Sequence, residues 1–343
     1  MRRLAIAAAT GFIVSLAAPS APVQAQRAVT VYCSVLDEWC NVMRNEFERA
    51  SGLRVLLTAK SAGETLAQLR AEAANPRADL WWGGGGDQHL QAAELGLTEE
   101  YKSPTLPKLH DWARKQAEQA QYRTVGIYAG TLGIVWNTEQ LQKRNLAAPK
   151  CWADLVKPEY RNEIQMSSAA TSGTSYTFIA TLAQIMGEDP AFDYLKRLHR
   201  NVNQYPRSGA APMRNTSAGE TTVAITWMFA IVPEVLLGFP VATVAPCEGT
   251  GYEIGSMSMI KGARNPENAR RWYEYALSPE GQATGVRGKS FQIPSNMDAP
   301  PPPNTPRLSD VKLIDYDFAR YGSNEVRTRL IKRWETEVAA QPR

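Results

Sequence analysis

Short β-like runs alternate with helical segments along the first part of this chain, and this alternation constrains the fold more than any other feature. Residues 28–32, 53–57 and 79–82 are predicted strands, because each run is short and rich in β-branched, aromatic or leucine side chains. Residues 38–50 and 63–75 are predicted helices. Strands separated by one helix each favour a parallel sheet with crossover connections, and hence an α/β fold.

Two later segments are predicted to connect this unit to a second one. The long run 125–137 is β-rich and interrupted by glycines, as expected for a strand that crosses between two lobes, and 251–261 is a second candidate crossing. Two crossings imply a two-strand hinge with a cleft between the lobes. We expect the two lobes to have these bounds: lobe I, 26–130 and 250–297; lobe II, 131–249 and 298–343.

The N-terminal segment has the pattern of a secretory signal. Arg2 and Arg3 precede an apolar run over 4–18, and small residues lead to Ala25. The run is too short to span a bilayer. We therefore expect residues 1–25 to be a signal peptide that is cleaved after Ala25, with an uncleaved membrane anchor as the alternative.

The charge balance argues against a nucleic-acid or membrane-surface partner. Without Arg2 and Arg3 the chain keeps 36 of its 38 basic residues against 34 acidic ones, and no long block of like charge. Proteins that bind nucleic acids or membrane surfaces have a stripe of basic residues on one face. The densest group of cations, in the predicted helix around 325–337, is interleaved with glutamates, so we expect a solvated face there.

Four cysteines remain after the predicted cleavage, in a compartment where disulfides persist. Three pairings are possible. We favour Cys33–Cys40 with Cys151–Cys247, because a local bridge across one turn is geometrically easy and it leaves one long-range bridge. A zinc site is the weaker alternative, because the cysteines lack zinc spacing and the three histidines are scattered.

Two turns rich in hydroxyl residues are candidates for anion binding. The turn 167–176 leads into an apolar helix and contains Ser172, Gly173 and Thr174. A single Ser or Thr would suffice to cap that helix, whereas backbone N–H groups, hydroxyls and the positive helix end together can hold an anion. Residues 61–65, with Ser61 and Gly63, have the same character in the first lobe. If the two turns face each other across the cleft, they can hold one anionic group from both sides.

The glycine run 83–86 could be mistaken for a nucleotide-binding loop. No Lys-Ser or Lys-Thr pair follows it, so the phosphate-binding pattern is incomplete. These glycines more plausibly allow the backbone to approach a ligand or a neighbouring strand.

Four segments in one frame resemble a known family. They are 31–36, 78–84, 172–176 and 245–253, and together they are similar to the periplasmic solute-binding proteins of ABC importers, of the ferric-ion-binding type and closest to its hexose-phosphate branch. The resemblance covers nearly all of the mature chain. It implies a two-lobed, type II periplasmic-binding-protein fold, in which two parallel or mixed sheets are joined by a two-strand hinge. It also implies a small solute and a membrane permease as partners, a monomer in the periplasm, no cofactor and no enzymatic activity.

The chain departs from this family at the turn 226–230, Thr-Trp-Met-Phe-Ala. The iron-binding members have adjacent tyrosines there, and Phe229 and Ala230 offer ferric iron no oxygen ligand. The hexose-phosphate branch has a His-Asp pair there, which is also missing. The resemblance implies that the family's second-lobe glutamate is retained as Glu248.

The predicted pocket therefore has anion-holding turns at one end and an apolar wall at the other. Trp39, Trp82, Trp227 and Phe229 are candidates for that wall, with the core as the alternative location of each ring. The expected ligand-binding residues are Ser34, Ser61, Gly63, Trp82, Gly83, Ser172, Gly173, Thr174, Trp227, Phe229 and Glu248.

Three functions of different classes remain open. The first is a binding protein that closes on a small organic phosphate, phosphonate or carboxylate and delivers it to an importer. The second is a ferric-ion binder that uses Tyr176 or Tyr252 with Glu248. The third is a secreted hydrolase, for which we find neither a Gly-x-Ser-x-Gly elbow nor a histidine beside a plausible serine.

Overall fold

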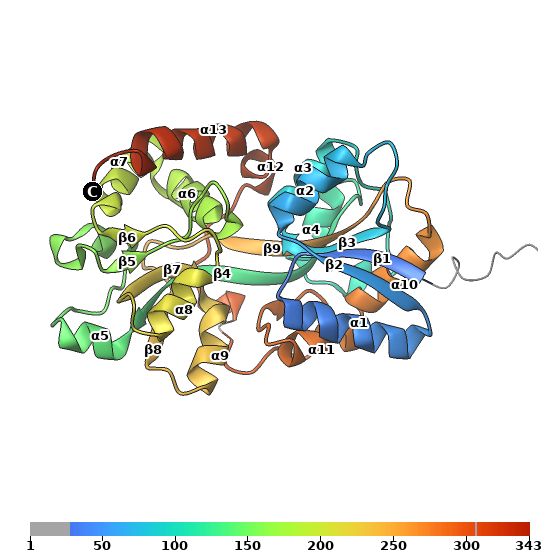
Figure 1. The fold of residues 1–343 in the computed structure, drawn as a ribbon, viewed down its shortest axis with the longest axis horizontal. Coiled ribbons are helices and arrows are strands. Elements are labelled where there is room, and N and C mark those ends of the chain that lie inside the picture. Colours follow the sequence, from blue (N-terminus) through green and yellow to red (C-terminus); the bar gives the residue numbers. More distant parts are fainter. Residues whose placement is uncertain (1–27, 306) are drawn as a thin grey trace, which may run out of the picture.

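One mixed sheet of ten strands runs through both halves of the molecule (Figure 1), in the computed structural model of residues 28–305 and 307–343. The strands are β1 (Ala28–Cys33), β2 (Arg54–Ala59), β3 (Leu80–Gly85), β4 (Val125–Asn137), β5 (Ile164–Gln165), β6 (Val202–Gln204), β7 (Val223–Trp227), β8 (Val241–Val244), β9 (Tyr252–Met259) and β10 (Ile293–Pro294). Their order is β2-β1-β3-β9-β4-β7-β5-β6, with β8 and β10 paired to β4.

Helices cover the sheet in both halves (Figure 1). They are α1 (Asp37–Ser51), α2 (Ala62–Ala71), α3 (Gly86–Glu94), α4 (Asp111–Gln119), α5 (Thr138–Lys143), α6 (Gly173–Met186), α7 (Glu188–His199), α8 (Ala211–Ser217), α9 (Ile231–Leu236), α10 (Pro266–Leu277), α11 (Pro279–Arg287), α12 (Phe318–Tyr321) and α13 (Asn324–Trp334).

The predicted α/β fold is confirmed, and the two predicted sheets are joined through β9 and β4 into one mixed sheet. β1 pairs in parallel with β2 and β3, as expected for strands joined by single helices, and β5 pairs in parallel with β6 and β7. β9 and β4 are antiparallel to their neighbours. The structure also agrees with the predicted elements to within a few residues at their ends.

Two strands connect the halves of the molecule. β4 and β9 pair antiparallel, with Gly130 opposite Glu253. The first part of β4 pairs with β9, and residues 132–137 pair with β7 and β8. Val125 belongs to one hydrophobic cluster, together with β1 and α10, and Leu132 belongs to another, together with α6 and α7. β4 therefore passes from one core to the other, and the exact lobe boundaries remain a prediction.

Both predicted disulfides are present. Cys33–Cys40 joins the end of β1 to the first turn of α1, and Cys151–Cys247 joins two segments that are 96 residues apart in sequence. Among the described residues no cysteine is free. A bridge of either kind lowers the conformational entropy of the unfolded chain.

We expect mild reduction to lower the free energy of unfolding by about 2–4 kcal/mol per bridge, because the reduced unfolded chain regains conformational entropy. Thermal unfolding with and without reductant measures this. In the oxidised protein, thiol titration under denaturing conditions should find no thiol, and two or more thiols per chain would contradict the pairing.

The predicted signal peptide, residues 1–25, lies outside the described residues. No helix in the described part of the chain combines the length and the apolar character that a membrane span requires.

Candidate functional site

A cavity of about 780 Å³ lies between the two halves of the molecule. Its walls come from the loop after β1, the start of α2, the start of α3, the turn before α6, the loop before α8 and the turn after β7. Tyr128 of β4 and Glu253 of β9 also line it. This volume suits a small organic solute.

The turn before α6 presents its hydroxyls and N–H groups to the cavity. Ser172 is the N-cap of α6, yet its side chain makes no capping hydrogen bond. Its hydroxyl accepts a hydrogen bond of 2.9 Å from Ser167, which leaves its own hydrogen to donate into the cavity. Gly173 and Thr174 also line the cavity, at the positive end of a helix of 14 residues.

The start of α2 differs from this arrangement, because Ser61 is engaged in capping. Its hydroxyl accepts from the Glu64 N–H, and its backbone N–H donates to the Glu64 carboxylate at 3.0 Å, so the two residues form a capping box. The hydroxyl also donates to that carboxylate, at 2.8 Å. This side-chain hydrogen bond lowers the pKa of Glu64. Ser61 and Gly63 line the cavity. What α2 can offer an anion is therefore its first-turn backbone N–H groups.

Ser34 lines the cavity at the end of β1. Its hydroxyl accepts from the indole N–H of Trp81 at 2.9 Å and lies 3.1 Å from the hydroxyl of Thr65. These two bonds orient Ser34 toward the start of α2.

The glycines at the end of β3 permit a close approach of backbone segments. Gly83 has φ +82, and a Cβ there would lie 2.4 Å from Cγ1 of Val35. Gly84 has φ +91, and a Cβ there would lie 2.8 Å from the Cβ of Ala62. Gly84 lines the cavity and Gly83 does not. Only glycine therefore lets the end of β3 fit against the loop after β1 and the start of α2.

Two of the four aromatic candidates line the cavity. Trp227 and Phe229 do, with ring planes 8° apart and centroids 6.3 Å apart. Trp82 is only 2% exposed and packs in the core against Trp39. Neither Trp82 nor Trp39 lines this cavity, so both leave the candidate site.

Glu248 also lies away from the cavity. Its carboxylate accepts hydrogen bonds from the backbone N–H groups of Trp152 and Ala153, at 2.8 and 2.9 Å. The carboxylate that lines the cavity is Glu253, five residues later on β9. The signal that could have found it is that Glu253 is the one acidic residue in the predicted crossing segment 251–261.

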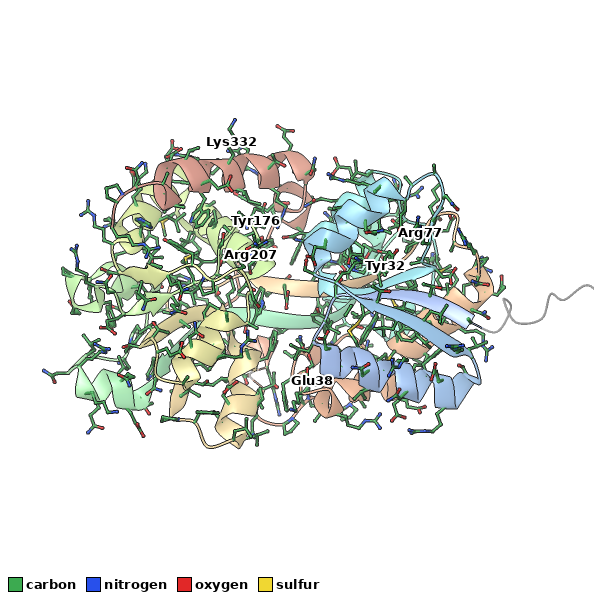
Figure 2. The ribbon with its side chains drawn as sticks, in the orientation of Figure 1. Tyr32, Glu38, Arg77, Tyr176, Arg207 and Lys332 are labelled. Carbon is green, nitrogen blue, oxygen red and sulfur yellow. A yellow bond between two sulfur atoms is a disulfide. The ribbon has the colours of Figure 1, made fainter. Side chains whose placement is uncertain are left out.

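Sequence reasoning missed the cations of the cavity wall. Arg207 and Arg214 line it from the second lobe and Lys289 from the first. Figure 2 shows Arg207 in the half of the molecule that contains α6, and Glu38 in the other half, at the start of α1. Arg207 is exposed, as expected for a charge that can move to meet an anion. The sequence feature that could have indicated Arg207 as a site residue is its position in a loop next to Ser208 and Gly209.

Two acidic groups lie on another part of the wall, Asp87, which is buried, and Glu253, which is half-buried. Burial raises the pKa of Asp87 to about 6, and the Arg327 guanidinium, 3.8 Å away, opposes that shift. Burial, together with the charge of Asp87, raises the pKa of Glu253 to about 8. Ionising Glu253 in the folded protein is therefore unfavourable.

This shift predicts a pH-dependent stability. The folded-state pKa of Glu253 lies above its ordinary value of 4.5. Wild-type stability should therefore fall as pH rises from 4.5 through 8, because the folded state keeps a proton that the unfolded state releases. Glu253→Gln cannot ionise. Relative to wild type, its free energy of unfolding should rise by about 4 kcal/mol between about pH 5 and pH 8.5 in urea titrations. If the free energies of unfolding of wild type and Glu253→Gln change in parallel with pH, the pKa of Glu253 lies near its ordinary value.

The residues of the other two candidate functions do not converge. The hydroxyl of Tyr176 donates to the backbone oxygen of Tyr321, and Glu248 is held by backbone N–H groups, so neither meets Tyr252 as an iron ligand. His89 does lie 2.8 Å from the hydroxyl of Ser258, a pair that the sequence did not reveal. Both side chains are fully buried outside the cavity, so a substrate has no access to them.

Known proteins match this chain over most of its length. An uncharacterized protein of Haemophilus influenzae is 39% identical over 338 residues, 98% of each chain. The structure of the periplasmic binding protein AfuA from Actinobacillus pleuropneumoniae, with fructose-6-phosphate bound, superimposes with a TM-score of 0.88 at 41% identity, covering 92% of this chain and 99% of AfuA. Iron-bound HitA from Pseudomonas aeruginosa, at 18% identity and a TM-score of 0.77, covers 89% of this chain and 98% of HitA and shares the fold.

A putative 2-aminoethylphosphonate-binding periplasmic protein of Salmonella paratyphi A is 24% identical over 298 residues, 82% of this chain and 83% of that protein. Residues 76–321 match the family described as bacterial extracellular solute-binding proteins. The chain belongs to this family of bacterial extracellular solute-binding proteins, and its role is that of the substrate-binding component of an ABC importer.

Proposed function

We propose that the protein captures a small anionic solute, an organic phosphate, phosphonate or carboxylate, between its two lobes and delivers it to a membrane permease. The observation that carries the proposal is that the starts of α2 and α6 line one cavity from opposite lobes. Helix N-termini favour anions through their unpaired N–H groups and their dipoles.

In this proposal each wall has a defined role. Ser172, Gly173 and Thr174 hold the anionic group from lobe II, the first turn of α2 holds it from lobe I, and Arg207 adds positive charge. Trp227 and Phe229 contact the body of the solute, so an apolar or aromatic body is preferred. Rotation about β4 and β9 brings the walls together.

The relatives support this class of solute. AfuA has been solved with fructose-6-phosphate, and the Salmonella relative bears the name of a phosphonate binder. Both are small molecules with a phosphorus-containing anionic group.

Mass spectrometry of solute released from natively purified, denatured protein tests the proposal directly. We expect a small anion in near-stoichiometric amount. A thermal-shift panel of phosphates, phosphonates and carboxylates follows, and a panel without any stabilising anion would contradict the proposal.

We further propose that the mature protein begins after Ala25, works as a monomer in the periplasm and has no enzymatic activity. Intact mass of the exported protein and light scattering test the first two statements. Incubation with the identified solute, followed by product analysis, tests the third.

A further inference from the structure

The cavity has an acidic part that an anion-binding function does not use. Asp87 at the start of α3 and Glu253 on β9 both line it, and the charge of Asp87 acts on Glu253. An anionic group gains less here than at the two helix starts, because the Arg327 guanidinium already faces the Asp87 carboxylate at 3.8 Å. The anionic end of the solute therefore belongs at the starts of α2 and α6, and these carboxyl groups face another part of the solute.

The strand register places Glu253 beside the aromatic wall. Gly130 of β4 is paired with Glu253 of β9, and residues directly opposite in an antiparallel pair point to the same face. A Cβ on Gly130 would lie 2.4 Å from Cε1 of Phe229. The Phe229 ring thus covers Gly130 on the face to which the Glu253 side chain points. A solute body in contact with Phe229 reaches Glu253.

Glu253 lacks a bonding partner in the described part of the chain, residues 28–305 and 307–343. No hydrogen bond or ion pair there involves its carboxyl group, whereas Asp87 has Arg327 at 3.8 Å. The Arg327 guanidinium thus stands beside Asp87, and no ion pair of the described residues brings it to Glu253. Glu253 is half-buried, and a partner supplied by the solute would offset the cost of removing its carboxylate from water.

A second group at the same place also lacks a partner. Tyr316 is 5% exposed and lines the cavity, and its hydroxyl has no hydrogen-bond partner among the described residues. The charges of Asp87 and Arg327 both act on it, so it lies in the same cluster. A buried, unpaired hydroxyl on a cavity wall indicates a missing ligand group.

We propose that the solute is zwitterionic, and that it carries a protonated nitrogen that binds Glu253 while its anionic group lies at the start of α6. This inference rests on the proposed function and names its substrate class, an amine-bearing organic phosphate or phosphonate. A protonated amine supplies the positive charge that Glu253 lacks and N–H donors for Tyr316. A sugar hydroxyl would supply a donor without the charge.

A metal ion fits this cluster less well than an amine. Hard cations need several oxygen ligands, and Arg327 stands beside the second carboxyl group and repels a cation there. Glu253 faces Asp87 of α3 and Tyr128 of β4, whose pKa is raised chiefly by burial and further by Glu253. Of the two carboxyl groups, Glu253 is therefore the one without an ion-pair partner among the described residues.

The experiment compares matched ligands on the full mature protein. The amines are 2-aminoethylphosphonate and 4-(aminomethyl)benzylphosphonate, and their uncharged counterparts are propylphosphonate and 4-ethylbenzylphosphonate. Calorimetric titration measures each with wild type, Glu253→Gln and the control Glu38→Gln, which removes an exposed acid from the cavity wall. Thermal unfolding confirms that each variant is folded.

In wild type and in Glu38→Gln, we expect at least one amine to bind about tenfold or more tightly than its counterpart, and in Glu253→Gln we expect that ratio to fall below about threefold. Near pH 7 the amine should also release up to about one proton per ligand, because it turns a protonated Glu253 into a carboxylate. Titrations in buffers of different ionisation enthalpy measure this release, which a merely structural Glu253 would not give.

Three results would overturn the inference. Equal affinity of amines and counterparts in wild type refutes the zwitterion and leaves the anion-binding function intact, because propylphosphonate tests that function alone. A preference for amines that survives in Glu253→Gln shows that the nitrogen binds elsewhere. Failure of every phosphonate to bind, together with release of a non-anionic native solute, would refute the proposed function and the inference with it.

Discussion

Replacing Ser172 by Ala together with Thr174 by Val should weaken binding of the anionic solute by about hundredfold or more. Both side chains are buried on the cavity wall at the start of α6. Each hydroxyl that donates to a charged group contributes about 1.5–3 kcal/mol, so the loss of two gives roughly this effect. Calorimetric titration with the native solute, or with the best ligand of the thermal-shift panel, measures it.

The same turn offers a matched control. Ser168→Ala removes a hydroxyl four residues earlier, outside the cavity wall, and should bind the solute like wild type. Ser172 also accepts a hydrogen bond from Ser167, so thermal unfolding must show that the double variant remains folded. Unchanged affinity in a folded double variant would remove these residues from the site.

Replacing Phe229 by His together with Ala230 by Asp should shift selectivity toward hexose phosphates. In wild type a sugar hydroxyl that faces Phe229 loses water without gaining a hydrogen bond, at about 1–3 kcal/mol for each unsatisfied group. The imidazole is smaller than the phenyl ring that now covers Gly130, so the variant avoids a steric conflict there. We expect glucose 6-phosphate to bind the double variant at least about tenfold more tightly than wild type.

A phosphonate with an apolar body gives the opposite readout in the same titrations. Its affinity should fall in the double variant, because the apolar wall becomes polar. The variant Phe229→Leu is the control, because it keeps an apolar side chain at this position. Tight binding of glucose 6-phosphate by the unmodified protein would show that the turn after β7 does not select the solute body.

Local pattern was sufficient to predict the elements, the two crossing strands and the disulfide pairing. Strand and helix periodicity are properties of neighbouring residues, so 28–32 or 38–50 could be assigned without knowing what packs on them. The bridge Cys33–Cys40 spans one turn, a distance that the chain itself limits. The hydroxyl-rich turn before α6 was likewise visible, because its residues are contiguous.

Local pattern could not decide whether Trp82 and Glu248 belong to the site. β3 is buried on both faces, and its adjacent indoles, Trp81 and Trp82, belong to two different hydrophobic clusters. Nothing in the run 79–82 tells which side is the cavity. The capping box likewise reassigns Ser61, because its hydroxyl bonds to Glu64.

The amino-acid pattern alone was enough to predict the class of fold and its two crossing strands, and to nominate the turn proposed to hold an anion, because these depend on residues close together in the chain. That Glu253 and Phe229 lie on one face of the β4–β9 pair follows only from how distant segments pack. That choice depends on the register of β4 against β9, where a shift of one residue would turn every side chain to the other face.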